Sequence, residues 1–184
     1  MARAAWTVIA RDGLDRASLR AIAEELGCTT GVLTHYFRDK DALLSFALET
    51  ILAELNLETL DPAAENLAMS EVRCILHRII PLHEESAKWW RVWLSFTVAS
   101  LTSTRQSGRH RALYARLRAL WTELFRNMQR RGTLLADLDV ALEAEALLCL
   151  VDGVGIQALI SPEALTPARQ LAIIDAHLKK ITAR

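Results

Sequence analysis

Two short helical patterns separated by a glycine constrain the fold of this chain more than any other feature. From position 18 to position 40 the sequence reads SLRAIAEELGCTTGVLTHYFRDK. The first pattern predicts a helix with one buried face, because apolar residues recur at the helical spacing at Leu19, Ile22, Ala23 and Leu26. We expect Ser18 to be the N-cap of this helix and Gly27 to end it. We expect Thr29 to be the N-cap of the next helix, where its side chain accepts backbone N–H bonds. Asp39 predicts the N-cap of a further helix, so the segment reads as a helix–turn–helix that continues into a third helical element.

The second helix of this motif has an apolar side and a side of small polar groups. The helical repeat gathers the first set at Val32, Leu33, Tyr36 and Phe37, and the second set at Thr30, Gly31, Thr34 and His35. A helix held by its apolar side and free on its polar side suits the DNA major groove, which admits a helix and displays hydrogen-bonding base edges. The alternative interpretation is an ordinary pair of surface helices.

The stretch GCTTGVLTHYFRDKDALL closely resembles the DNA-binding signature of TetR-type transcriptional regulators. The match is free of gaps and rests on Gly27, Gly31, Leu33, Tyr36, Phe37, Lys40, Ala42 and Leu43. The resemblance implies a set of DNA-contacting residues, namely Thr29, Thr30, Gly31, Thr34, His35, Tyr36 and Lys40. Within it, we expect Tyr36 to bury its ring and offer its hydroxyl to a phosphate, and Lys40 to hold a phosphate at a helix N-terminus. A solvated lysine is the alternative for Lys40, and Thr30 departs from the basic residue that is frequent in the family.

Charge gives DNA binding little support. The chain carries 22 basic and 22 acidic side chains, and residues 1–48 hold six of each. Phosphate attraction normally supplies much of the affinity of a DNA-binding protein. We therefore expect either a basic extension upstream of Met1 or weak binding per monomer.

Composition favours a chain made of helices. Apolar residues make up 52% of the 184 positions, whereas there are only seven glycines and four prolines. The breaks predict helices at about 2–11, 63–80, 82–104, 109–131, 138–160 and 167–182, in addition to the helix–turn–helix and the helix after Asp39. We expect an all-α fold in which a three-helix DNA-binding head, residues 1–46, precedes a ligand-binding and dimerisation bundle, residues 47–184.

Two helices of the bundle have the pattern of a self-association surface. The helix at 138–160 is apolar on nearly every side, and the last helix carries a heptad-like stripe. We expect a symmetric four-helix dimer interface, which the family resemblance also implies, formed by Leu147, Val151, Gly153, Val154, Gly155, Leu159, Leu171, Ile174, Leu178 and Ile181. Packing within one chain is the alternative.

Aromatic residues crowd two of the predicted bundle helices. Trp89, Trp93 and Phe96 share one helical face, and Trp121 and Phe125 are spaced by four. Together with Asp152, which interrupts the most apolar helix, they predict a pocket for a small organic inducer. Core packing is the alternative for each aromatic residue, and a structural pair is the alternative for Asp152. The C-terminal half, in particular LVDGVGIQALI, resembles the BetI-like branch of the family, which implies no single ligand.

No pattern in the sequence indicates catalysis. It contains no serine elbow, glycine-rich phosphate loop or metal-binding helix signature, and Cys74 and His77 alone do not make a zinc site. We expect no cofactor, no metal and no membrane span, and a cytoplasmic location consistent with three widely spaced cysteines. The sequence thus predicts a homodimeric, ligand-responsive regulator, most simply a repressor, that binds a near-palindromic double-stranded DNA operator. The competing hypothesis is a small-molecule-binding helical dimer whose head no longer binds DNA.

Overall fold

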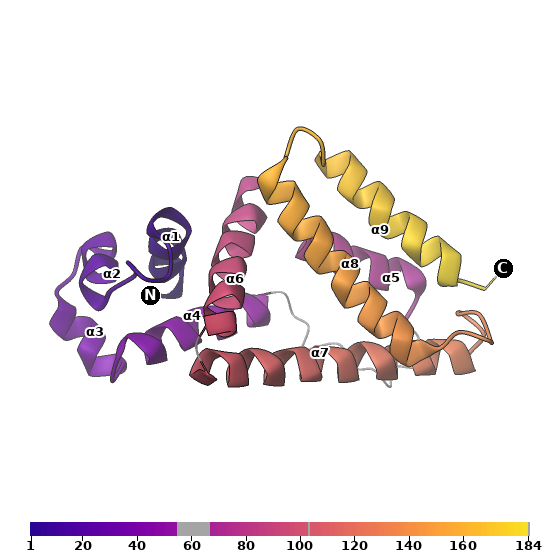
Figure 1. Cartoon of the computed structure of the whole chain (residues 1–184), viewed down its shortest axis with the longest axis horizontal. Coiled ribbons are helices and arrows are strands. Elements are labelled where there is room, and N and C mark those ends of the chain that lie inside the picture. Colours follow the sequence, from indigo (N-terminus) through magenta and orange to yellow (C-terminus); the bar gives the residue numbers. More distant parts are fainter. Residues whose placement is uncertain (55–66, 103, 184) are drawn as a thin grey trace. The chain divides into compact units, whose positions relative to one another are not determined.

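The structure, a computed structural model of the chain, describes residues 1–54, 67–102 and 104–183. These residues form an all-α fold, as the sequence predicts (Figure 1). The described part of the chain contains nine helices: α1 (Ala2–Asp12), α2 (Leu19–Leu26), α3 (Thr30–Tyr36), α4 (Lys40–Glu54), α5 (Met69–Ile79), α6 (Glu84–Thr102), α7 (Thr104–Arg130), α8 (Val140–Ile160) and α9 (Pro167–Ile181).

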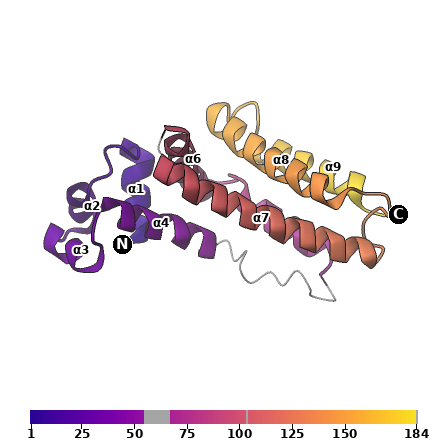
Figure 2. The same cartoon turned by 60° about the horizontal axis from the view of Figure 1, so that its bottom comes forward.

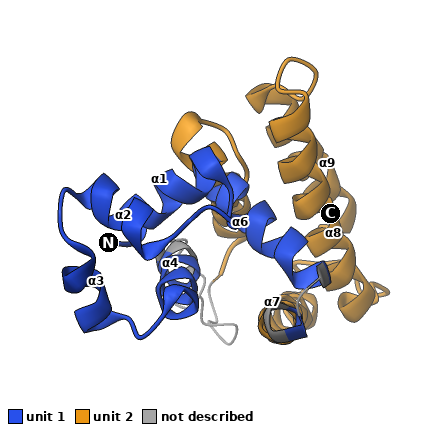
Figure 3. Ribbon diagram, turned by 60° about the vertical axis from the view of Figure 1, so that its left-hand side comes forward, with its two compact units in different colours: residues 1–58, 88–107 blue, residues 59–87, 108–184 orange. Residues whose placement is uncertain are grey.

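The chain divides into two compact units, which Figure 3 colours separately. The head unit comprises residues 1–58 and 88–107, and the bundle unit comprises residues 59–87 and 108–184. This division differs from the contiguous split at residues 46 and 47 that the sequence predicts, because most of α6 packs with the first four helices. Helix α6 itself continues from one unit into the other.

The head unit is built around the apolar faces of α1, α4 and α6. Val8, Leu43 and Val92, one from each helix, are completely buried in the same core. Trp6 of α1 donates its indole N–H to the carbonyl of Ala47 in α4, at 2.8 Å in the interior. Its ring also meets Trp89 of α6 edge to face, with centroids 6.4 Å apart. Trp6 therefore ties α1 to both of the other helices.

The bundle unit packs α9 against α5 and α8, and Figure 2 shows α8 and α9 side by side. Leu76, Leu147 and Ile174, one from each helix, are completely buried. The carboxylate of Asp175 in α9 lies 3.0 Å from the His77 ring nitrogen in α5. None of the helices in the described ranges combines the length and apolar character needed to span a bilayer.

Two predicted helix limits are wrong. The predicted break between helices at Ser103–Gly108 is too long, because α7 already begins at Thr104 and includes Gly108. Ser103 lies outside the described residues. A glycine inside a helix costs about 1 kcal/mol, and the run of alanine, leucine and arginine around it outweighs that cost. The helix predicted at 63–80 corresponds to α5, which begins at Met69. At its start, the Glu71 carboxylate accepts the N–H of Ala68.

Trp6 and Trp89, whose rings meet edge to face in the head, offer a matched test of this core. Trp6→Phe and Trp89→Phe each remove the same volume, but only the first removes a hydrogen bond, because within the described residues the buried Nε1 of Trp89 has no partner. We expect Trp6→Phe to lower the free energy of unfolding by about 1 kcal/mol more than Trp89→Phe. Thermal unfolding followed by circular dichroism measures the difference. Equal losses would show that the bond to Ala47 contributes nothing.

Candidate nucleic-acid interface

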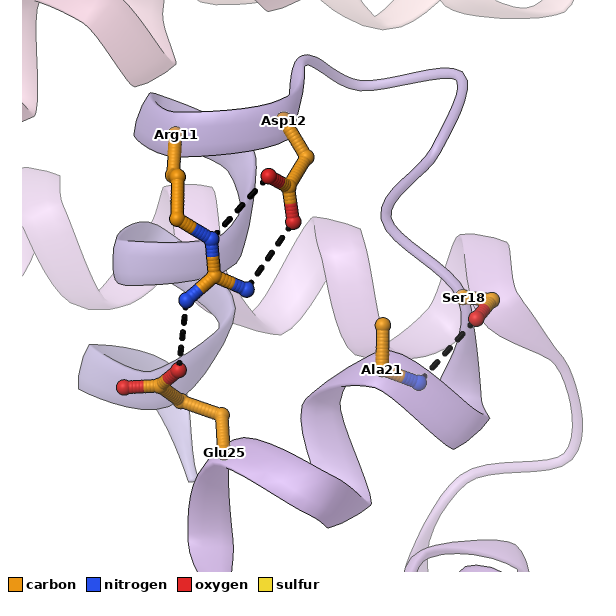
Figure 4. Close-up of polar contacts among 5 residues, drawn as sticks. All are labelled: Arg11, Asp12, Ser18, Ala21 and Glu25. Atoms are coloured by element: carbon orange, nitrogen blue, oxygen red, sulfur yellow. Dashed lines mark hydrogen bonds and ion pairs between the residues drawn. The ribbon is translucent and has the colours of Figure 1, made fainter.

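The turn between α2 and α3 is set by local chemistry that the sequence predicts correctly. The Ser18 hydroxyl accepts the N–H of Ala21 at 3.1 Å and caps α2 (Figure 4). Gly27 ends α2 with φ 67° and ψ 28°, a left-handed conformation that an L side chain rarely adopts. The chain then enters α3 with Thr29 at the N-cap position. Within the described residues, however, the Thr29 side chain makes no capping bond, so that part of the prediction is wrong.

Helix α3 is anchored by fewer side chains than its apolar pattern predicts. Leu33 is completely buried, and Phe37, just beyond the helix, is half-buried with its ring 5.4 Å from that of Phe46. The apolar pattern predicts Val32 and Tyr36 in the core, but they are 40% and 65% exposed. A two-turn helix that packs mainly on α2 can bury only the residue at the centre of the contact. The prediction that Tyr36 buries its ring is therefore wrong.

The polar edge of α3 is open to solvent. Thr30, Gly31, Thr34 and His35 are all exposed, as is Tyr36 beside them. The Thr34 hydroxyl bonds to the carbonyl of Gly31 at 3.2 Å, and the His35 and Tyr36 rings meet at right angles with centroids 5.0 Å apart. This edge presents hydroxyl and imidazole groups, which can both donate and accept hydrogen bonds.

Lys40, at the start of α4, is engaged by its own chain. Its ammonium donates to the carbonyls of Leu14 and Asp15, at 2.8 and 3.0 Å, in the loop between α1 and α2. Asp39, the residue before it, accepts the N–H of Ala42 at 2.8 Å, which confirms the predicted N-cap. The structure thus gives Lys40 an intrachain contact that the sequence did not predict.

Three arginines of the head, Arg11, Arg20 and Arg38, face carboxylates. Arg11 bonds to both Asp12 and Glu25, as Figure 4 shows, and the bond to Arg11 lowers the pKa of the Asp12 carboxyl. Two further pairs join neighbouring residues on the surface, Arg20 with Glu24 and Arg38 with Asp39. Exposed pairs of this kind add little stability, but they neutralise the charge that would attract DNA.

The candidate ligand residues fall in both units. In the head unit, Phe96 belongs to the buried core and Trp89 packs against it, while Trp93 is half-buried. In the bundle unit, the structure brings Trp121 and Phe125 together, both buried, with ring centroids 5.8 Å apart.

Asp152 of α8 has a partner that the sequence did not predict. Its carboxylate accepts the hydroxyl of Tyr114 in α7, whose ring also lies under the guanidinium of Arg118. Burial, followed by the bond to Asp152, raises the pKa of the Tyr114 hydroxyl. Thirty-eight positions separate the two residues, so no spacing rule could have paired them.

The candidate dimer residues lie mostly inside a single chain. Seven of the ten are buried: Leu147, Val151, Val154, Gly155, Ile174, Leu178 and Ile181. Leu159 and Leu171 are half-buried, and only Gly153 of the ten is exposed. The residues predicted to form the dimer interface therefore pack α8 and α9 within the chain. A different stripe of α8 is exposed, at Leu142, Ala146, Cys149, Gly153 and Ile160.

Comparison with known proteins agrees with this architecture. Residues 2–45 match the family described as bacterial regulatory proteins, tetR family, and residues 68–183 match the BetI-type transcriptional repressor C-terminal family. The HTH-type transcriptional regulator PksA of Bacillus subtilis is 31% identical over 98% of this chain and 87% of its own length.

Two solved structures share the fold. A transcriptional regulator from Rhodococcus is 25% identical, with a TM-score of 0.80 over 98% of this chain and 92% of that one. A transcriptional regulator from Saccharomonospora viridis, solved in complex with choline, is 24% identical, with a TM-score of 0.77 over 100% and 96% of the two chains. The relatives are regulators and not enzymes. The chain is a transcriptional regulator of the TetR family, with a helix–turn–helix head and a BetI-type C-terminal domain.

Proposed function

We propose that this regulator binds a near-palindromic DNA operator as a homodimer, represses transcription there, and leaves the DNA when a small organic molecule binds. The observation that carries the DNA-binding part is the open polar edge of α3. Leu33 anchors the helix in the core of the head, while Thr30, Thr34 and His35 remain exposed. A helix in this state can enter a major groove without first displacing other parts of the protein.

The exposed groups of α3 suit the reading of base edges. Threonine hydroxyls can bond to either donors or acceptors in the major groove, and their methyl groups can contact thymine. Two copies of α3 about 34 Å apart would meet successive major grooves on one side of the duplex. Tyr36, with its ring outside the core, is placed to reach a sugar or phosphate beside those bases.

Thr34 can be tested against a matched residue of the same type. Thr50 lies on α4, and both hydroxyls bond to a carbonyl in their own helix, of Gly31 and Phe46 respectively. We expect Thr34→Ala to lose about tenfold in affinity for the operator and to change base preference, since one base contact contributes about 1–3 kcal/mol. Thr50→Ala should bind as the parent does. Band shifts on DNA from the promoter region of its own gene measure both variants; identical behaviour would remove Thr34 from the interface.

A second candidate function is a ligand-binding dimer whose head does not engage DNA. The pairing of Arg11, Arg20 and Arg38 with carboxylates favours it. The two candidates differ in one measurement, binding to the promoter fragment at low salt. Binding that weakens as salt is added supports the operator-binding regulator. No binding at any salt concentration supports the second candidate.

The inducer site is proposed in the bundle unit, with Asp152, Trp121 and Phe125 as its candidate contacts. The buried aromatic rings supply apolar surface, and Asp152 and Tyr114 supply polar groups. A related fold binds choline in the structure from Saccharomonospora viridis, which supports a small organic molecule as the ligand class. Its chemical identity is left to experiment.

Asp152 and Asp175 provide a matched pair for testing the inducer site. Both are half-buried carboxylates of the bundle unit that bond to a side chain, of Tyr114 and His77 respectively. Native mass spectrometry of the protein purified from its host should detect a bound small molecule. We expect Asp152→Asn to lose it and Asp175→Asn to retain it. Retention by both variants would exclude Asp152 from the site.

The dimer surface is proposed on the exposed stripe of α8 rather than on the residues chosen from the sequence. Leu142 and Ile160 are 66% and 70% exposed, and three small residues lie between them on the same side. A second copy would cover these side chains and allow close approach at Gly153. Ile173 of α9 is a further exposed apolar residue of the bundle unit, at 36%.

We expect Leu142→Glu to convert the dimer into a monomer, because each two-fold interface would bury two carboxylates. Leu135→Glu is the control, since Leu135 is an exposed leucine of the bundle unit outside α8. Light scattering after size-exclusion chromatography measures both masses. A dimer that survives Leu142→Glu would place the interface elsewhere.

A further inference from the structure

We infer that the imidazole of His83 is a pH-sensitive N-cap of α6, which holds the first turn of that helix when neutral and releases it when protonated. The inference goes beyond the proposed function and does not depend on it, because it concerns the free protein alone. Helix α6 begins at Glu84, so His83 is the residue just before it. Figure 3 colours the start of α6 with the bundle unit and its continuation from residue 88 with the head unit.

His83 and Ser86 bond to each other in both directions. The N–H of Ser86 donates to Nδ1 of the His83 ring at 3.2 Å, and the N–H of His83 donates to the Ser86 hydroxyl at 3.2 Å. The Ser86 hydroxyl in turn donates to the His83 carbonyl at 2.9 Å, and this carbonyl also accepts the N–H of Ala87. The reciprocal arrangement is that of a capping box, with an imidazole in the place of the usual hydroxyl or carboxylate.

The bond from the Ser86 N–H fixes the protonation state of the ring. A backbone N–H can only donate, so Nδ1 of His83 must accept, and the ring proton must be on Nε2. A protonated imidazole carries an N–H on both nitrogens and has no acceptor left. Histidine is the side chain whose charge ordinarily changes between about pH 5 and pH 8. The cap is therefore present when the imidazole is neutral and is lost when acid protonates it.

The burial of Ser86 makes the loss of this cap destabilising. Ser86 is 1% exposed, whereas His83 is exposed to the buffer and its protons. Water has little access to the Ser86 N–H when the imidazole no longer accepts it, and a buried donor without a partner is unfavourable. The segment before the cap is also held, since the buried Gln170 carboxamide donates to the carbonyls of Pro81 and Leu165, at 3.3 and 3.1 Å. This restraint limits the freedom of the chain to supply another cap.

Charged neighbours act in both directions on a protonated His83. Within the described residues, each contact of the imidazole is with Ser86, and no ion pair reaches the ring. The other charged or titratable side chains of the segments around this corner are His77 and Arg78 of α5, Glu84, Glu85 and Lys88 of α6, Glu163 before α9, and Arg169 and Asp175 of α9. Glu84 and Glu85 would attract a positive ring, but both are exposed, and exposed charges contribute little in water. The positive end of the α6 dipole would repel the ring, so the loss of the cap decides the direction of the effect.

Hydrogen exchange at single backbone amides tests the cap, and α2 supplies an internal control. Ser86 and Ala21 are each the third residue of a helix, and each donates its N–H to the side chain of the N-cap residue, His83 or Ser18. From pH 8 to pH 5, we expect the protection factor of the Ser86 amide to fall about fivefold, in line with the usual contribution of an N-cap. The protection factor of Ala21 should stay constant, because a serine hydroxyl takes up no proton in this range.

Two variants of His83 separate the titration of the ring from other effects of acid. His83→Asn supplies a side-chain oxygen that caps the helix and takes up no proton, so Ser86 should stay protected at both pH values. His83→Ala removes the cap, and we expect the lower protection at both. Thermal unfolding should follow the same order, with the parent close to His83→Asn at pH 8 and close to His83→Ala at pH 5. The reason is that the capped imidazole binds a proton less readily in the folded chain than in the unfolded one.

Two results would overturn the inference. One is a protection factor of the Ser86 amide that does not change with pH in the parent protein. The other is an equal fall in the parent and in His83→Asn, which would assign the pH dependence to another group. If the parent protein does not bind DNA, the proposed function fails, but the exchange measurements still test the cap by themselves.

Discussion

The burial of Trp6 between α1, α4 and α6 is the interaction on which the rest of the head depends. Its indole N–H satisfies a carbonyl inside α4, and its ring contacts Trp89 of α6. Helix α3 has no comparable core of its own, because it is seven residues long and fully buries only Leu33. The reading surface is therefore placed by helices that carry none of its polar groups. Rigidity and recognition are supplied by different parts of the sequence.

The charged residues of the head also contribute to its structure more than to DNA recognition. Arg11, Arg20 and Arg38 are paired with acidic neighbours, and Lys40 is bonded to carbonyls of the α1–α2 loop. These contacts leave less positive charge for general attraction to a phosphate backbone. Discrimination between DNA sequences would then rest more on the fit of hydroxyl and imidazole groups than on electrostatic attraction. Such a protein would bind DNA of arbitrary sequence weakly, and its affinity would depend on the correct operator sequence.

Local chemistry was readable from the sequence, and long-range packing was not. Ser18, Gly27 and Asp39 each act on atoms three or four positions away, so residue type and spacing predict their roles. The position of Tyr36 depends on how much of α3 is covered, and the contacts of Lys40 depend on a loop 25 positions earlier. Periodicity on α9 correctly indicated a buried stripe, but it could not say whether the chain itself or a second copy buries it. In the structure, α5 and α8 cover Ile174 and its neighbours within one chain.

The continuity of α6 has a consequence for how members of such a family exchange parts. The core of the head contains Val92 and Phe96, which are encoded about fifty codons after the helix–turn–helix. A recombination event, or an engineered chimera, that joins two proteins just after α4, at residue 54, would pair one ancestor's α1 and α4 with the other's α6. Compatibility would be decided at Trp6, Trp89 and their neighbours. Heads with new DNA preferences are thus more easily obtained by changing the surface of α3 than by transplanting the N-terminal segment.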